Sequence, residues 1–219
     1  MERKWKKILF VLIICAMLAT GLNLIFKPFD SERYDTLQSE SNAALSDMET
    51  TMESLDSKNN DVSNVTPVSN HKEEQSKEVE GGKISIPSLN IELAILEGST
   101  QENLDKGATT LIENKVMGEG NYSLAAHHMR DESLFFGKLD QIEEGTYIYI
   151  TDYEYIYTYK YKSIKEVHES EVDILEDHGK DELTLITCDK PTATEYRTVV
   201  TAELTKKEMY KNDMWESEK

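Results

Sequence analysis

Short runs of alternating apolar and polar residues fill the chain from residue 81 onward. The segments GTYIYITD and YIYTYKYK both alternate with a period of two, and the residues between them, Asp152–Tyr155, predict a hairpin. A short helix is predicted over QENLDKGA, ending at Gly107. Many short strands with few helices predict an all-β domain and favour a closed barrel over a sandwich. Other strand candidates, bounded by Gly, Pro, Asn or Asp, are ISIPSLNIELAILEG, NYSLAAHHM, ELTLITC and RTVVTAEL.

The N-terminus has a different pattern. Basic residues in segment 1–7 precede an apolar run from Ile8 to Phe26, which is about long enough to cross a bilayer as a helix. Positive charge on the N-terminal side predicts that residues 1–7 stay in the cytoplasm, that 8–29 form a transmembrane signal-anchor, and that the rest lies outside. A cleaved signal peptide is the alternative, but its small-residue cleavage site is weak because Met17 lies two positions before Ala19.

Residues 30–80 form a polar linker. They contain 13 acidic and 4 basic residues, a net charge of 4 − 13 = −9, and their composition predicts little independent core. An apolar series with heptad-like spacing predicts a short membrane-proximal helix, with a solvated stalk as the alternative. That series is Leu45, Met48, Met52 and Leu55. The folded domain is expected over 81–206 and a polar tail over 207–219.

Charge and cysteine content narrow the classes of function. The formal net charge of −18 excludes a nucleic-acid partner, because phosphate binding requires a basic surface. One of the two cysteines, Cys15, lies in the expected anchor, so Cys188 is predicted to be a free thiol outside the cell. A structural zinc site would need four close ligands and paired cysteine spacings, which are absent.

Cys188 ends the apolar segment TLITC. A catalytic thiol needs a proton-transfer partner and donors for a developing oxyanion. His127 and His128 close the apolar segment SLAA; since adjacent strand residues face opposite sides, only one of them can point at a given site. Arg197 opens the next strand after a turn and could return to the Cys188 end, where its guanidinium fork suits an anionic intermediate. Taken singly, such residues more often have other roles: a cysteine in an apolar strand usually packs in the core, and an arginine that begins a strand is usually a surface charge.

The joint pattern is more specific. TLITC at 184–188, followed by Arg197 nine residues after the cysteine, resembles the TLxTC…R signature of the sortases, and LAAH at 124–127 resembles the segment that ends in their active-site histidine. The order of these residues and the N-terminal anchor resemble a class A, housekeeping sortase of Gram-positive bacteria. The resemblance covers roughly 81–204 and implies an eight-stranded sortase-type β-barrel with short helices, preceded by the transmembrane helix and the polar stalk.

The resemblance also implies an activity. Cys188 would attack the Thr–Gly carbonyl of an LPXTG-type sorting signal and form a thioester, which an amine of a peptidoglycan precursor of the lipid II type then resolves. His127 would be the acid/base partner and Arg197 would hold the peptide and stabilise the oxyanion. The partners would be LPXTG-bearing surface proteins, on the outer face of the cell membrane. The alternatives are a membrane-anchored cysteine peptidase that hydrolyses the acyl-enzyme, and an inert surface binding module.

A Leu-Pro signal requires an apolar groove beside the thiol. Many class A sortases have glycine directly before the catalytic histidine, where this chain has Ala126, which leaves the fine substrate preference open. No cofactor is expected; the acidic stretches 97–119 and 169–176 leave calcium activation open, as in some sortases, without an assigned site. The residues expected to bind substrate are Ala125, Ala126, Ile186, Thr187, Val172, Ile174 and Leu175.

Overall fold

The computed structural model describes residues 31–59, 81–211 and 215. The expected anchor over 8–29 and its basic flank lie outside the described residues, as do linker residues 60–80 and most of the end of the tail. Within the part of the chain that is described, no helix combines the length and the apolar character needed to cross a membrane.

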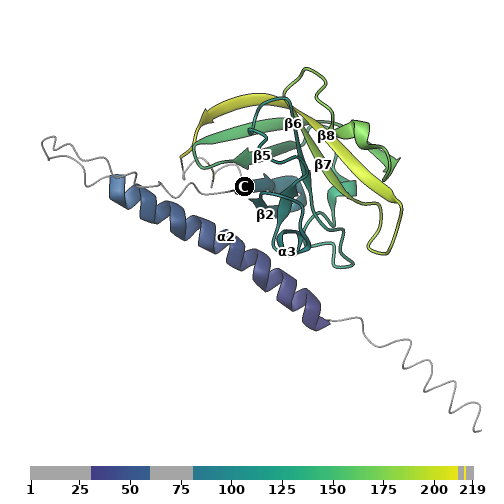
Figure 1. Ribbon diagram of the computed structural model, residues 1–219, viewed down its shortest axis with the longest axis horizontal. Helices are drawn as coiled ribbons and strands as arrows, with labels where there is room; N and C mark the ends of the chain where they lie inside the picture. Colours follow the sequence, from purple (N-terminus) through teal and green to yellow (C-terminus); the bar gives the residue numbers. More distant parts are fainter. Residues whose placement is uncertain (1–30, 60–80, 212–214, 216–219) are drawn as a thin grey trace, which may run out of the picture. The chain divides into compact units, whose positions relative to one another are not determined.

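Eight strands close into a barrel in the order β1-β2-β3-β4-β7-β8-β6-β5, which confirms the predicted all-β fold (Figure 1). The pairs β2–β3 and β4–β7 are parallel, and the other pairs are antiparallel. The strands are β1 Gly82–Ile86, β2 Ile91–Leu96, β3 Ala108–Thr110, β4 Asn121–Ala125, β5 Tyr147–Thr151, β6 Tyr155–His168, β7 Glu182–Cys188 and β8 Tyr196–Met209.

Four short helices lie in the connections. One of them, η1, begins at Pro87, which interrupts the apolar stretch between β1 and β2. The predicted short helix is present as α3 but ends before Gly107, because residues 105–107 form a turn. The four helices are η1 Pro87–Leu89, α3 Gln101–Leu104, η2 Leu139–Gln141 and η3 Val172–Leu175.

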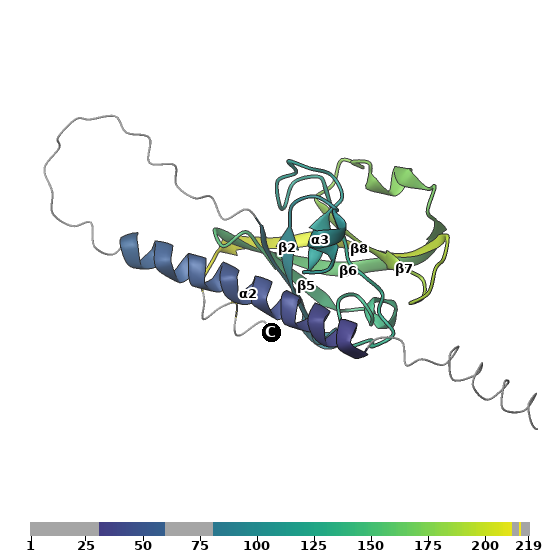
Figure 2. The same cartoon turned by 60° about the horizontal axis from the view of Figure 1, so that its bottom comes forward.

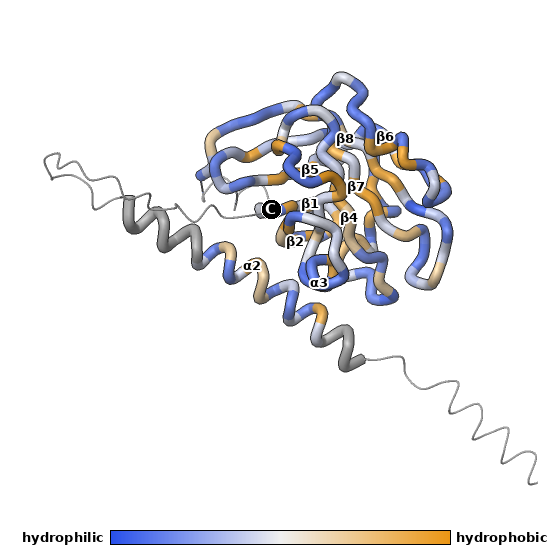
Figure 3. Tube along the Cα trace, in the orientation of Figure 1, coloured by the Kyte–Doolittle hydropathy of each residue, from blue (hydrophilic) through white to orange (hydrophobic). Residues whose placement is uncertain are grey.

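The core is the barrel interior, and alternate residues of each strand supply it. Leu183 and Leu185 of β7 and Val200 of β8 are fully buried there, as is Leu124 of β4. Apolar stretches follow the barrel strands, whereas the connections are mostly hydrophilic (Figure 3). Residues at the intervening positions of β4, β7 and β8 therefore lie on the outer face of the barrel, and this face carries the candidate chemistry.

The predicted hairpin is confirmed as β5–β6, with Tyr147 paired to Lys160 and Thr151 to Ile156. Its turn depends on Asp152, whose carboxylate accepts hydrogen bonds from two backbone N–H groups, those of residues 154 and 155. Tyr153 adopts a left-handed conformation with φ of 66°. An aspartate that bonds the backbone ahead of it is a common way to stabilise such a turn.

The linker contains a helix, α2, over Ser31–Asn59, longer than the short helix that the apolar spacing predicts. No glycine or proline occurs in these 29 residues, so nothing in the sequence interrupts the helix. Among the side chains described over 36–50, Leu37 and Ser41 are buried, four residues apart, and share one helix face with the partly buried Leu45 and Met48.

Lys83 of β1 is a buried charge in the barrel wall, with 2% of its side chain exposed. Its Nζ lies 2.7 Å from a carboxylate oxygen of Glu49 and 3.0 Å from one of Glu92. The same ammonium lies 5.5 Å from the ring centroid of Trp215, which is also buried. These partners compensate for the loss of hydration of the ammonium.

Candidate active site

The parallel pair β4–β7 brings the histidine segment beside the cysteine. Ala125 is in register with Ile186, and the N–H of Ala126 donates to the carbonyl of Ile186 at 3.2 Å. His127 and Cys188 each lie two residues beyond this register pair, on the same face as its members. The order of elements along the barrel therefore places the predicted acid/base residue and the predicted nucleophile on neighbouring chain segments.

Two side-chain bonds hold these segments together. His128 Nδ1 lies 2.8 Å from the carbonyl oxygen of Cys188 and, because a carbonyl can only accept, His128 is the donor. The hydroxyl of Thr187 donates to the carbonyl of Ala126 at 2.8 Å. His128 thus positions the backbone of the cysteine.

Cys188 carries a free thiol and is partly exposed. It is in direct register with Arg197 across the antiparallel strands β7 and β8. Side chains at directly opposed positions of such a pair leave the same face of the sheet. The thiol and the arginine side chain therefore start on the same outer face of the barrel, as the nine-residue spacing and the intervening turn predict.

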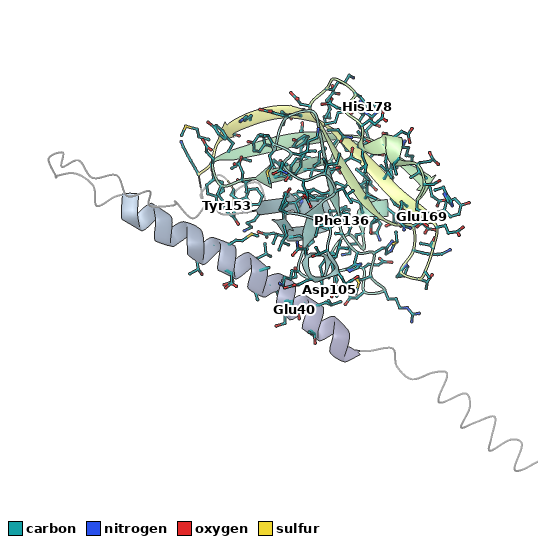
Figure 4. The ribbon with its side chains drawn as sticks, in the orientation of Figure 1. Glu40, Asp105, Phe136, Tyr153, Glu169 and His178 are labelled. Atoms are coloured by element: carbon teal, nitrogen blue, oxygen red, sulfur yellow. The ribbon has the colours of Figure 1, made fainter. Side chains whose placement is uncertain are left out.

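The guanidinium of Arg197 is held by three acceptors. Its Nη2 donates to the carboxylate of Glu169 at 2.6 Å, and its Nη1 donates to the carbonyls of Thr194 at 3.0 Å and Tyr196 at 2.9 Å. Glu169 belongs to the connection between β6 and η3, where Figure 4 labels it. A guanidinium has five N–H donors, so these bonds leave donors for a further oxygen.

Asp105 lies against His127, although sequence reasoning did not assign it a role. One of its carboxylate oxygens, Oδ1, is 3.3 Å from His127 Nε2, and Figure 4 labels it beside α3. On the other side, the Phe135 ring meets the imidazole edge-on, with centroids 5.8 Å apart and planes at 89°. An acidic residue at the end of a predicted helix is the only sequence signal that pointed to this contact.

A covered apolar surface lies on the outer face, and its residue Ile186 is two positions before Cys188 on β7. Ile186, Val199 and Val167 are buried in it, because Ile174, Leu175 and Leu111 pack over them. Figures 1 and 2 show η3, which carries Ile174 and Leu175, beside β7 and β8. Three of the expected substrate-binding residues, Ile186, Ile174 and Leu175, thus lie together within this surface.

The other expected substrate-binding residues lie in different surroundings. Ala125 is partly exposed on the same face as Ile186. Ala126 and Thr187 are buried on the opposite side of their strands, and the hydroxyl of Thr187 is already bonded to a carbonyl. Val172 opens η3 with 68% of its surface exposed, so its side chain is available to solvent.

Asn121 fixes the connection that carries η3, and sequence reasoning gave it no role. Its amide donates to the carbonyls of Ile174 at 2.9 Å and Glu176 at 3.0 Å, while its carbonyl accepts from the buried Thr184 hydroxyl at 2.7 Å. A buried amide with all of these partners holds the connection in one position over the apolar surface.

Among the described residues, no group of three or more His, Cys, Asp or Glu side chains is placed to hold a metal ion. Glu97 uses its carboxylate inside the protein instead, accepting from the Thr110 hydroxyl at 2.9 Å and the Asn114 N–H at 2.8 Å. Glu102 of α3 pairs with Lys106, and the hydrogen bond from that lysine lowers the pKa of its carboxyl.

Comparisons with known proteins agree with this geometry. Residues 84–205 match the sortase domain. The chain is 35% identical to sortase A of Listeria monocytogenes over 203 residues, covering 90% of this chain and 91% of that protein. It is 36% identical to sortase A of Bacillus anthracis over 187 residues, covering 84% and 88%. The crystal structure of Listeria monocytogenes sortase A is similar with a TM-score of 0.61 and 42% identity, covering 62% of this chain and 94% of that one.

The closed eight-stranded barrel and the match over residues 84–205 show that the chain belongs to the sortase family, whose members are cysteine transpeptidases. Its likeness to sortase A proteins over most of its length places it among the class A sortases. It is therefore an enzyme of the kind that anchors surface proteins through a cysteine.

Proposed function

We propose that this transpeptidase cleaves an LPXTG-type sorting signal between Thr and Gly and transfers the surface protein to an amine of a lipid II-type peptidoglycan precursor. We place the reaction on the outer face of the cell membrane, with the chain anchored by residues 8–29 and its N-terminus inside. The register pair Cys188–Arg197, beside the segment that ends in His127, is the observation that carries this proposal.

In the first half-reaction, the sulfur of Cys188 attacks the threonine carbonyl carbon and a tetrahedral oxyanion forms. His127 then donates a proton to the glycine nitrogen as the C–N bond breaks, which leaves a thioester on Cys188. In the second half-reaction, the acceptor amine attacks the thioester carbon, His127 takes the amine proton, and the cysteine sulfur leaves. A new amide bond replaces the old one, and the enzyme returns to its starting state.

Arg197 is the proposed donor to the oxyanion and to the peptide carbonyls. Its backbone lies directly opposite Cys188, so its side chain starts on the side of the barrel where the carbonyl must lie. The bond to Glu169 partly neutralises its charge before substrate arrives. Substrate oxygens therefore either use the remaining N–H donors or replace Glu169.

The apolar surface around Ile186 supplies the groove for the Leu-Pro part of the signal. Ala125 extends this surface toward His127, and Val172 lies at the exposed start of η3. Ala126 and Thr187 contribute through the backbone, since their side chains are buried.

The test uses the full chain in detergent with a fluorogenic LPXTG peptide, with and without triglycine as amine acceptor. We expect cleavage after threonine in both cases and, with triglycine, a product in which the threonine carbonyl carries the new amide bond. Mass spectrometry identifies that product. Hydrolysis alone, unchanged at any triglycine concentration, would show a peptidase instead.

A further inference from the structure

The connection that carries Asp105 is rigid and close to the barrel. The N–H of Asp105 donates to the carbonyl of Gln101 at 3.0 Å, and the N–H of Gly107 donates to that of Asn103 at 3.0 Å. Gly107 packs so closely on β2 that a Cβ there would clash with the Ala94 carbonyl. The Asp105 side chain therefore leaves a fixed backbone position.

The carboxylate of Asp105 is itself oriented. Its Oδ1 accepts a hydrogen bond from the side-chain amide of Gln101 at 2.8 Å, and the same oxygen faces His127 Nε2 at 3.3 Å. Asp105 and His127 are both partly buried, with 25% of the Asp105 side chain and 29% of the His127 side chain exposed. Because an ionised carboxylate only accepts hydrogen bonds, this contact favours the ring form that has its hydrogen on Nε2.

The imidazole is constrained on its other side as well. The Phe135 ring meets it edge-on, and the carbonyl of His127 accepts the Phe136 N–H at 3.0 Å. With Nε2 directed at Asp105, Nδ1 is the ring nitrogen left to exchange a proton with substrate.

We infer that Asp105 is a positioning residue that holds His127 with its hydrogen on Nε2, so that Nδ1 transfers the proton in both half-reactions. This inference rests on the proposed role of His127. The Cys188 thiol first gives its proton to Nδ1, which passes it to the leaving amine as the thioester forms. Nδ1 later takes a proton from the acceptor amine and returns it to the cysteine sulfur as that sulfur leaves. Nε2 keeps its hydrogen throughout, bonded to Asp105.

The test compares Asp105→Ala and Asp105→Asn with the parent chain, and uses Glu102→Gln as the matched control. Glu102 lies in α3, three residues before Asp105, but pairs with Lys106. We expect kcat to fall about 10- to 100-fold in Asp105→Ala, in line with the loss of an orienting partner, with KM for the peptide within about twofold. Asp105→Asn keeps an acceptor oxygen, so its kcat is expected to be higher than that of Asp105→Ala. The kcat of Glu102→Gln is expected to equal that of the parent.

Nitrogen-15 NMR of histidine-labelled chain gives a readout that a merely structural role would not move. In the parent, the neutral His127 ring should show a protonated Nε2 and an unprotonated Nδ1, and Asp105→Ala should show a mixture of the two ring forms. A kcat within about twofold of the parent in Asp105→Ala, or ring signals that do not change, overturns the inference.

The proposed function and the positioning role of Asp105 can be contradicted separately. Full activity of His127→Ala would contradict the proposed function, whereas the NMR comparison of the parent with the Asp105 variants would still report whether Asp105 sets the ring form. If His127→Ala loses activity but the NMR signals of the His127 ring are the same in the Asp105 variants as in the parent, only the positioning role of Asp105 is contradicted.

Discussion

Cys188 and Arg197 are directly opposed across β7 and β8, yet the guanidinium is bonded to Glu169 rather than left free beside the thiol. Strand register thus places Arg197 opposite Cys188, and Glu169, from the connection after β6, binds its guanidinium. In the proposed mechanism, substrate competes with the Glu169 carboxylate for the guanidinium, and this competition can be measured.

We predict that Glu169→Gln raises kcat/KM for the sorting peptide. A partly exposed ion pair is worth about 0.2–1 kcal/mol, which corresponds to an increase of about 1.4- to 5-fold if substrate must replace it. Steady-state peptide cleavage measures the effect. Glu171→Gln, in the same connection, is the control and should leave kcat/KM unchanged; a fall in Glu169→Gln would mean that the carboxylate assists the reaction.

The two adjacent histidines should respond differently to substitution. His127→Ala should lower kcat by about 10²–10⁴-fold, because it removes the proposed general acid–base residue. His128→Ala should lower the free energy of unfolding by about 1 kcal/mol, because it removes the bond to the Cys188 carbonyl, and should retain far more activity. Parallel kinetics and urea unfolding of both variants test this, and equal kcat losses would contradict the division of roles.

The barrel should lose stability in alkali. Burial raises the pKa of Tyr122 and Tyr159 above the ordinary value. The stability that these neutral phenols contribute is complete below about pH 10, the unfolded value, and is lost as the pH rises further, by up to about 1.4 kcal/mol per group and pH unit.

Urea unfolding between pH 8 and 11 follows this loss. Tyr159→Phe should flatten the alkaline decline, while Tyr147→Phe, at an exposed position, should not. An equally steep decline in the parent and in Tyr159→Phe would rule out this phenol as a source of the effect.

The barrel should stay nearly as stable when Lys83 loses one of its two carboxylate partners, but should lose much stability when it loses both. Glu49→Gln leaves the ammonium paired with Glu92 and should cost about 0–1 kcal/mol of unfolding free energy. The double variant Glu49→Gln/Glu92→Gln leaves a buried ammonium without a carboxylate and should cost about 3–5 kcal/mol. Urea unfolding measures both, and simple additivity of two small effects would contradict this account.

The strand pattern predicted the fold because alternation reports directly which side of a strand is buried. GTYIYITD and YIYTYKYK became the hairpin β5–β6 with the expected turn. The linker helix α2 is longer than the apolar spacing predicts, because its 29 residues contain no helix-breaking glycine or proline, a feature that polar composition does not reveal. The strand order of the barrel could not be predicted from alternation, because alternation does not show which strands pair with each other.

The candidate site was predictable where a motif carried it. The segments LAAH and TLITC and the later Arg197 matched one family motif, and the structure places them on adjacent strands or at their ends. The acidic partners were missed because Asp105 and Glu169 come from connections whose positions depend on the fold. Thr187 was expected to line the groove, but strand alternation turns its side chain inward, away from Cys188.

The central claim is that the Cys188 thiol forms the thioester, and intact-protein mass spectrometry tests it most directly. The full chain is incubated with an LPXTG peptide in the absence of an amine and quenched in acid. The account predicts an added mass equal to the peptide through its threonine, located on Cys188, absent from Cys188→Ala, and released as an amide when triglycine is added. Peptide cleavage by Cys188→Ala, or an adduct on any other residue, would contradict the account.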